Sequence, residues 1–122
     1  MAPLTFVMAA LGCGLGAMLR YWLSTWRHRH RWPWPTFVAN ILGTALLGAA
    51  AALAESDYLS DSAAFIVGGG IAGGLTTFST LAVDSLVLWR ASRVRAVQYL
   101  VITGVMGVAA GAAGWAIAQS LT

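Results

Sequence analysis

The stretch GGLTTFSTLAVD, residues 73–84, interrupts the third of four apolar runs in this chain. It places two glycines and four hydroxyl side chains, Thr76, Thr77, Ser79 and Thr80, where a membrane helix usually carries aliphatic residues. Glycine lowers helix propensity, and hydroxyls compete for backbone hydrogen bonds. Unwound backbone survives in a membrane only where it is buried in protein or lines a wet cavity. The stretch predicts a broken membrane helix; the alternative is a continuous helix whose hydroxyls bond back to their own turns.

The composition places the whole chain in a membrane. Of its 122 residues, 59% are hydrophobic and only 9% are charged, whereas an ordinary soluble domain has roughly 25% charged residues. We expect an all-α membrane protein with one domain, residues 1–122, and four helices at about residues 4–25, 34–54, 63–89 and 96–118. We expect no enzyme, because no room remains for a soluble catalytic domain, and His28 and His30 lie among arginines without a neighbouring acid or nucleophile.

The charges are divided between the two ends of the expected bundle. All basic residues except Arg20 follow the first and third spans, whereas the loop between spans two and three carries acids and no basic residue. By the positive-inside bias, the arginine loops are cytoplasmic and both termini lie outside. Lipid headgroups and topology therefore explain the pI of about 9.8 better than nucleic acid does. The loop residues are Arg27, Arg29, Arg31, Arg90, Arg93 and Arg95 on one side and Glu55, Asp57 and Asp61 on the other.

Polar side chains within the spans need partners, because an unpaired amide in hydrocarbon is unfavourable by several kcal/mol. Asn40 in span two either makes an interhelical hydrogen bond or donates into a polar pathway. Arg20 either snorkels to the interface or raises the anion concentration at a pathway mouth. Asp84 can pair with Arg20 or the arginines after span three, or cap an interrupted helix. Phe78 can turn a ring edge, which is the positive part of its quadrupole, toward an anion. Together these residues favour an ion path.

Glycines four residues apart predict close helix packing, because they form grooves that another backbone can enter. Four short spans offer too little protein to enclose a pathway alone, so we expect at least a dimer. The glycine pairs are Gly12 and Gly16, Gly69 and Gly73, Gly70 and Gly74, and Gly107 and Gly111.

Three stretches carry a resemblance to a known family: GLGAMLRY (14–21), WPTFVANILG (34–43) and GGLTTFST (73–80). The chain resembles the Fluc (CrcB) fluoride channels. The resemblance implies a passive fluoride channel of the bacterial cytoplasmic membrane that gives fluoride resistance. It also implies an antiparallel dimer of four-helix subunits, with two fluoride pores and a structural sodium ion at the dimer centre.

The resemblance also implies roles for single residues. The backbone carbonyls of Gly74 and Thr77 would hold the sodium, with the register open by one residue. Phe78 would line the fluoride pore with its ring edge. Arg20 would lie near the vestibule. The whole implied pore set is Arg20, Asn40, Phe78, Ser79, Thr80, Leu81 and Thr103.

Two departures from the family pattern affect the dimer. Leu81 stands where the family has its second aromatic residue, so one ring edge is missing, and Asp84 replaces the usual glutamate. The uneven loop charges argue against one sequence inserting in both orientations. A heterodimer with a homologous chain of opposite topology is therefore favoured over a homodimer, and both stay open.

Other functions remain alternatives. A small dual-topology multidrug exporter also uses four short helices, but it needs a membrane-embedded carboxylate in span one, and residues 4–25 contain none. A subunit without transport of its own, such as the non-conducting partner in a heterodimeric fluoride channel, would explain the glycines. It would leave Asn40 and the hydroxyl cluster unexplained.

Overall fold

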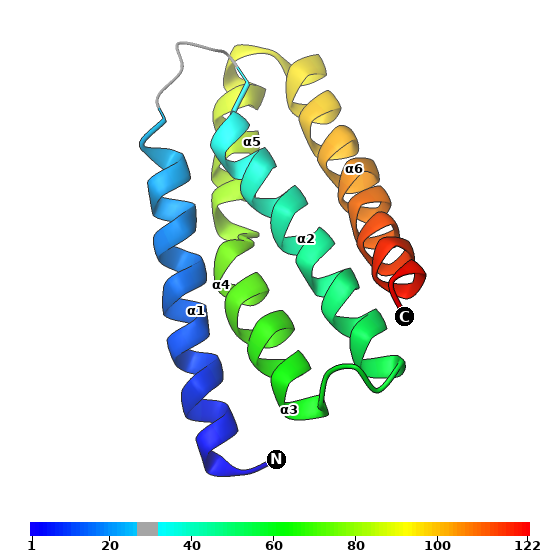
Figure 1. The fold of residues 1–122 in the computed structure, drawn as a ribbon. Coiled ribbons are helices and arrows are strands. Elements are labelled where there is room, and N and C mark those ends of the chain that lie inside the picture. Colours follow the sequence, from blue (N-terminus) through cyan, green and yellow to red (C-terminus); the bar gives the residue numbers. More distant parts are fainter. Residues whose placement is uncertain (27–31) are drawn as a thin grey trace.

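A computed structural model describes residues 1–26 and 32–122 and shows helices connected by short loops (Figure 1). Four helical segments are long and apolar enough to cross a membrane, which confirms the expected all-α membrane architecture. Their elements are α1 (Pro3–Ser24), α2 (Trp34–Glu55), α3 (Asp61–Ala64), the π-helical η1 (Phe65–Ala72), α4 (Gly73–Leu75), α5 (Ser79–Ala91) and α6 (Arg93–Ser120).

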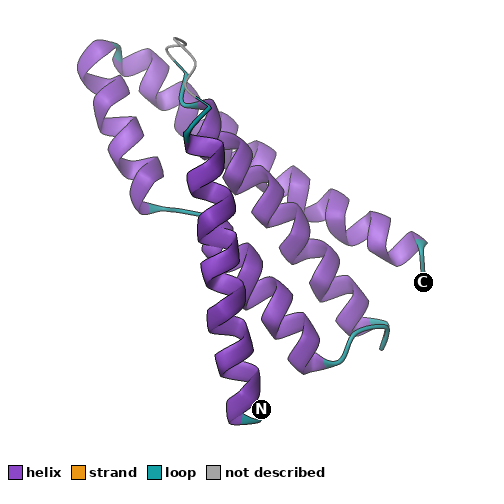
Figure 2. Ribbon diagram, turned by 60° about the vertical axis from the view of Figure 1, so that its left-hand side comes forward, coloured by secondary structure: helices purple, strands orange, loops and turns teal. Residues whose placement is uncertain are grey.

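The third span is broken between α4 and α5, as the glycines and hydroxyls predict. Thr76 is extended, with φ −76° and ψ 154°, a conformation outside the helical region. Its amide still donates to the Ala72 carbonyl, whereas the next amide, that of Thr77, leaves the helical ladder and donates to a side chain of α2. Figure 2 shows the short link between the two halves of the span. The break lies near the middle of the 31-residue segment Asp61–Ala91.

Serine caps set the starts of the third and fourth helical segments. Ser60 Oγ accepts a hydrogen bond from the Ala63 amide at 3.1 Å, and Ser92 Oγ accepts one from the Arg95 amide at 3.3 Å. Such caps satisfy amides that have no partner within the helix. The helices therefore begin at Asp61 and Arg93, a few residues before the expected spans.

Glycines bring α1 against the first half of the broken span. A methyl group on Gly16 would overlap the Ile71 carbonyl oxygen, and one on Gly74 would overlap the Cys13 carbonyl oxygen. Only hydrogen side chains permit this approach between backbones. α2 makes its most extensive contact with α6, where Gly114 is equally close to the backbone of α2. The first half of the broken span thus packs against α1 and α2, which carry Arg20 and Asn40, whereas α5 packs mainly against α6.

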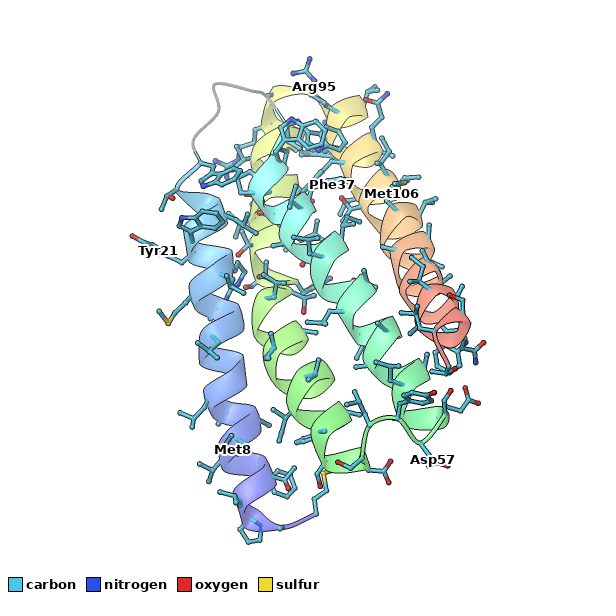
Figure 3. All side chains as sticks on the ribbon, viewed as in Figure 1. Met8, Tyr21, Phe37, Asp57, Arg95 and Met106 are labelled. Atoms are coloured by element: carbon cyan, nitrogen blue, oxygen red, sulfur yellow. The ribbon has the colours of Figure 1, made fainter. Side chains whose placement is uncertain are left out.

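Charged residues of opposite sign lie at opposite ends of the bundle. Arg95 is at the end where α5 meets α6, and Asp57 is at the other end, beside the connection from α2 to α3 (Figure 3). Both chain termini also lie toward the Asp57 end (Figure 1). The charge division in the sequence therefore corresponds to a division in space.

Candidate functional site

Asn40 binds the broken backbone from α2 through both ends of its amide. Its Oδ1 accepts a hydrogen bond from the Thr77 amide at 2.7 Å, and its Nδ2 donates to the Thr77 carbonyl at 3.1 Å. These bonds replace those that Thr77 would make in a continuous helix. The structure thus shows the interhelical hydrogen bond considered for Asn40. Its amide still has a second N–H, for which the hydrogen bonds of the described residues include no acceptor.

Arg20 binds the other half of the break from α1. Its Nε donates to the Gly74 carbonyl at 3.2 Å, in a half-buried position. A cation is favourable at a helix C-terminus, where carbonyls lack amide partners, and Gly74 lies in the last turn before the break. The guanidinium is therefore engaged with protein backbone, which snorkelling alone does not require.

The hydroxyl groups of the break form a small network around Thr77. Its Oγ1 accepts a hydrogen bond from the Thr80 amide at 3.1 Å and donates to Thr80 Oγ1, also at 3.1 Å. Ser79 Oγ lies 3.4 Å from the same oxygen. Thr76 Oγ1 donates to the Gly73 carbonyl at 3.3 Å. The hydroxyls thus order the link, and O–H groups of this kind can rotate to donate elsewhere.

A cavity of about 350 Å³ lies against this network. It is bordered by the last turns of α1, the first turn of α2 and the break, so it lies toward the end of the bundle that carries the arginine loops. Its lining combines one guanidinium with several hydroxyls and includes no acid among the described residues. This chemistry suits a small anion. The polar lining residues are Arg20, Tyr21, Ser24, Thr36, Thr77 and Thr80.

Phe78 and Ser79 lie outside this cavity. Phe78 is 82% exposed, and Ser79 is exposed as well. Leu81 is half-buried and packs instead against a cluster that includes Leu88 and Tyr99. Arg20 and Thr80 therefore line the cavity, Asn40 holds the break beside it, and Phe78 faces outward from the subunit.

Thr103 lies on α6 and does not line the cavity. It is 7% exposed, and its hydroxyl has no hydrogen-bond partner among the described residues. A buried hydroxyl without a partner is unusual. Among the described residues Thr103 does not connect to the cavity, so its place in a pore stays a prediction.

A second polar group, not predicted from the sequence, joins three spans. Thr36 Oγ1 donates to Asp84 Oδ2 at 2.6 Å, and the Tyr99 hydroxyl donates to the same oxygen at 3.4 Å. Asp84 therefore accepts hydrogen bonds from hydroxyls rather than from the arginines considered for it. Asp84 itself was the signal in the sequence that could have predicted this group, because a carboxylate within a span requires hydrogen-bond donors. Thr36 and Tyr99 are donors on other spans at a similar depth. Thr36 also lines the cavity, which links this group to the break.

Side-chain ligands offer no conventional metal centre in the described parts of the chain, where no three His, Cys, Asp or Glu residues come together. The oxygen atoms at the break belong to backbone carbonyls and to hydroxyl groups. Two of the carbonyls, on Gly74 and Thr77, already accept hydrogen bonds from Arg20 and Asn40.

Fold and site together define a multi-pass membrane protein whose third span is broken beside a polar, cationic cavity. Residues 7–115 match the family described as CrcB-like protein, Camphor Resistance (CrcB). The chain therefore belongs to the CrcB family, as the three sequence stretches predict.

Curated relatives match over most of the chain. It is 32% identical over 123 residues to the fluoride-specific ion channel FluC of Helicobacter acinonychis (strain Sheeba), covering 96% of this chain and 97% of that protein. It is 35% identical over 122 residues to the protein of the same name from Bordetella petrii, covering 98% and 94%. A third, from Thermus thermophilus, is 36% identical over 92 residues, covering 73% and 72%.

Proposed function

We propose that this chain is a subunit of a fluoride-selective channel, through which fluoride leaves a bacterial cell passively across the cytoplasmic membrane and which gives fluoride resistance. The observation that carries the proposal is the cavity beside the break, where Arg20, Thr77 and Thr80 offer a fixed positive charge and hydroxyl donors to a small anion. The names of the curated relatives support the choice of fluoride.

The cavity explains how an anion would be attracted and partly dehydrated. Anion pores select by diameter, by hydrogen-bond donors and by a cation such as arginine. Arg20 raises the local anion concentration, and the hydroxyls of Thr77 and Thr80 can turn toward an ion that has lost water. The second N–H of Asn40 is a further donor at the same depth.

The working unit in this proposal is an antiparallel dimer. An 82% exposed Phe78 beside a broken backbone needs a cover, and a second subunit supplies one while completing the pore on that side. The arginine loops are proposed to be cytoplasmic and both termini outside. This fixed orientation favours a heterodimer with a homologous chain of opposite topology over a homodimer, and Leu81 fits a pair in which one pore is the better conductor.

A structural sodium at the dimer centre is part of the proposal, but Gly74 does not suit it. The Gly74 carbonyl accepts from a guanidinium at 3.2 Å, which repels a second cation, and Gly74 is buried against α1. One residue earlier, Gly73 is exposed, and the described part of the chain gives its carbonyl one side-chain donor, the neutral Thr76 hydroxyl. The register with Gly73 and Thr76 is therefore the better pair of carbonyl ligands.

Fluoride efflux from liposomes that contain the purified chain, alone and with a homologous partner, tests the function. We expect fluoride flux, little chloride flux, and loss of flux in Phe78→Ile. Phe6→Ile is a matched control, because Phe6 is an exposed aromatic residue of α1, distant in sequence from the break. Chloride flux at a rate comparable to that of fluoride would refute the selectivity.

Reporter fusions at the C-terminus test the orientation separately. A fixed topology predicts signal on the outer side only. Equal signals from both sides would reject the fixed orientation, and fluoride flux from the isolated chain would favour the homodimer.

A further inference from the structure

An apolar groove of about 300 Å³ lies between α5 and α6, apart from the cavity at the break. Leu86 and Trp89 form one wall, and Val97 and Leu100 form the other, with Ala96 and Ser85 at the base. The four wall residues are each about half exposed, from 46% to 55%. The groove is therefore an apolar surface that the fold itself leaves uncovered.

Two arginines stand at the end of this groove nearest the α5–α6 connection. Arg90 lies four residues after Leu86 on α5, and Arg93 lies four residues before Val97 on α6, so each shares a helix face with a wall residue. The guanidinium carbon of Arg93 is 5.2 Å from the centre of the Trp89 ring. Residues 90–95 contain three arginines and no acid. The rim is thus cationic, whereas the groove is apolar.

This combination matches the two parts of an anionic phospholipid. An acyl chain has no hydrogen-bonding groups and suits the apolar walls, and a phosphate suits arginine. Tryptophan is enriched at the membrane–water boundary, so Trp89 lies at the depth where headgroup and chain join. Basic residues near a membrane surface attract anionic lipids.

The length of the groove favours a lipid chain over a helix of a second subunit. Its walls cover about five residues on each helix, or roughly 7 Å at ~1.5 Å per residue. Helix packing usually buries an apolar stripe that repeats over several turns of each partner, whereas these walls cover little more than one turn of about 5.4 Å. An acyl chain is narrower than a helix and can continue into the bilayer.

We propose that the groove between α5 and α6 binds one acyl chain of an anionic phospholipid, with the headgroup phosphate against Arg90 and Arg93. None of the residues that line the groove lines the cavity at the break. The bound phospholipid would lie on the lipid-facing side of the third and fourth spans, at the end of the bundle that carries Arg90 and Arg93.

Tryptophan quenching by lipids with brominated acyl chains tests this site in the reconstituted full chain. The contribution of Trp89 is the difference between the wild type and Trp89→Phe. We expect brominated phosphatidylglycerol to quench Trp89 more strongly than brominated phosphatidylcholine at equal mole fraction. Each arginine should raise occupancy about fivefold near an anionic headgroup.

Variants of the arginines and of the groove wall distinguish the contribution of charge to lipid binding from that of the apolar groove. The double variant Arg90→Gln and Arg93→Gln should lose the preference for phosphatidylglycerol. Arg95→Gln should keep it, because Arg95 lies two residues after Arg93 in α6 and residues two apart on a helix do not share a face. Val97→Phe, which fills the groove, should lower quenching by both lipids. Native mass spectrometry of each variant should show the matching change in retained phosphatidylglycerol.

Three results would overturn the proposal. The first is equal quenching of wild-type Trp89 by both lipids, and the second is a preference that survives the double variant. The third is a Trp89 that neither lipid quenches, together with disulfide crosslinking between copies carrying Val97→Cys and Cys13→Ala, which would assign the groove to a second subunit.

Discussion

The side-chain amide of Asn40 forms two hydrogen bonds with one residue, Thr77, accepting from its amide and donating to its carbonyl. The two residues are 37 positions apart in the chain. The pair lies where the third span leaves the helical ladder, so a side chain of α2 replaces the missing helical partners. A break in a membrane helix therefore persists here without exposing the Thr77 amide or carbonyl to hydrocarbon.

Asn40→Ala should destabilise the protein and abolish fluoride efflux. The change leaves both backbone groups of Thr77 without their side-chain partner, at up to about 1–3 kcal/mol for each group, and less where water from the cavity reaches the half-buried Thr77. Thermal unfolding in detergent and fluoride efflux from liposomes measure the two effects. Thr44→Val is the control, because Thr44 only bonds back to the Asn40 carbonyl. A variant Asn40→Ala with wild-type unfolding temperature would contradict the role of the pair.

Thr36→Val should destabilise the fold more than Tyr99→Phe. Both hydroxyls donate to Asp84, but the Thr36 bond is 2.6 Å and the Tyr99 bond is 3.4 Å. A short hydrogen bond to a charged group contributes about 1.5–3 kcal/mol, and a long one contributes less. Unfolding midpoints of the two isosteric variants give the order directly, and the reverse order would show that Tyr99 is the main partner of Asp84.

Arg20→Gln should lower fluoride efflux most strongly at low ionic strength. Glutamine retains a donor for the Gly74 carbonyl but removes the charge, so the loss reports attraction of the anion. Added salt screens that attraction beyond about 10 Å at 0.1 M. It should therefore reduce the difference in fluoride efflux rate between the wild type and Arg20→Gln. Arg20→Lys, which keeps the charge, should retain most of the efflux. An efflux deficit in Arg20→Gln that salt leaves unchanged would assign Arg20 to bracing the break alone.

Gly16→Ala should destabilise the protein, whereas Gly14→Ala should not. A methyl group at Gly16 would overlap the Ile71 carbonyl, whereas at Gly14 it meets no atom within 4 Å. Overpacking typically costs about 1–3 kcal/mol, and alanine in an exposed helix gains roughly 0.5–1 kcal/mol over glycine. Melting temperatures of the two variants should therefore shift in opposite directions. Equal shifts would mean that α1 and the third span are not packed through Gly16.

The sequence was sufficient to predict the four spans and the break, because both depend on local chemistry. Apolar length identifies a span, and glycines with hydroxyls weaken a helix wherever they occur. The starts of the third and fourth helices were expected slightly late, because the caps Ser60 and Ser92 were not used as start signals. Capping is also local, so these boundaries were within reach of the sequence.

The partners of the polar residues were less predictable. That Asn40 needs a partner follows from its place in a span, but its choice of Thr77 depends on how α2 rotates against α5. The Thr36, Asp84 and Tyr99 group likewise depends on three helices meeting at one depth. The sequence did not indicate that Phe78 is exposed, because the direction of its side chain depends on the backbone path through the break.

The position of the break has an electrical consequence. Because the link after Thr76 lies near the middle of the 31-residue span, an anion that reaches it from either side has crossed about half of the membrane voltage. Half of the full drop corresponds to roughly 1.2 kcal/mol per elementary charge at 100 mV. In the proposed channel, occupancy of the break by fluoride should therefore change with voltage about half as steeply as complete transfer does, and the membrane potential would help to set how often the pathway is filled.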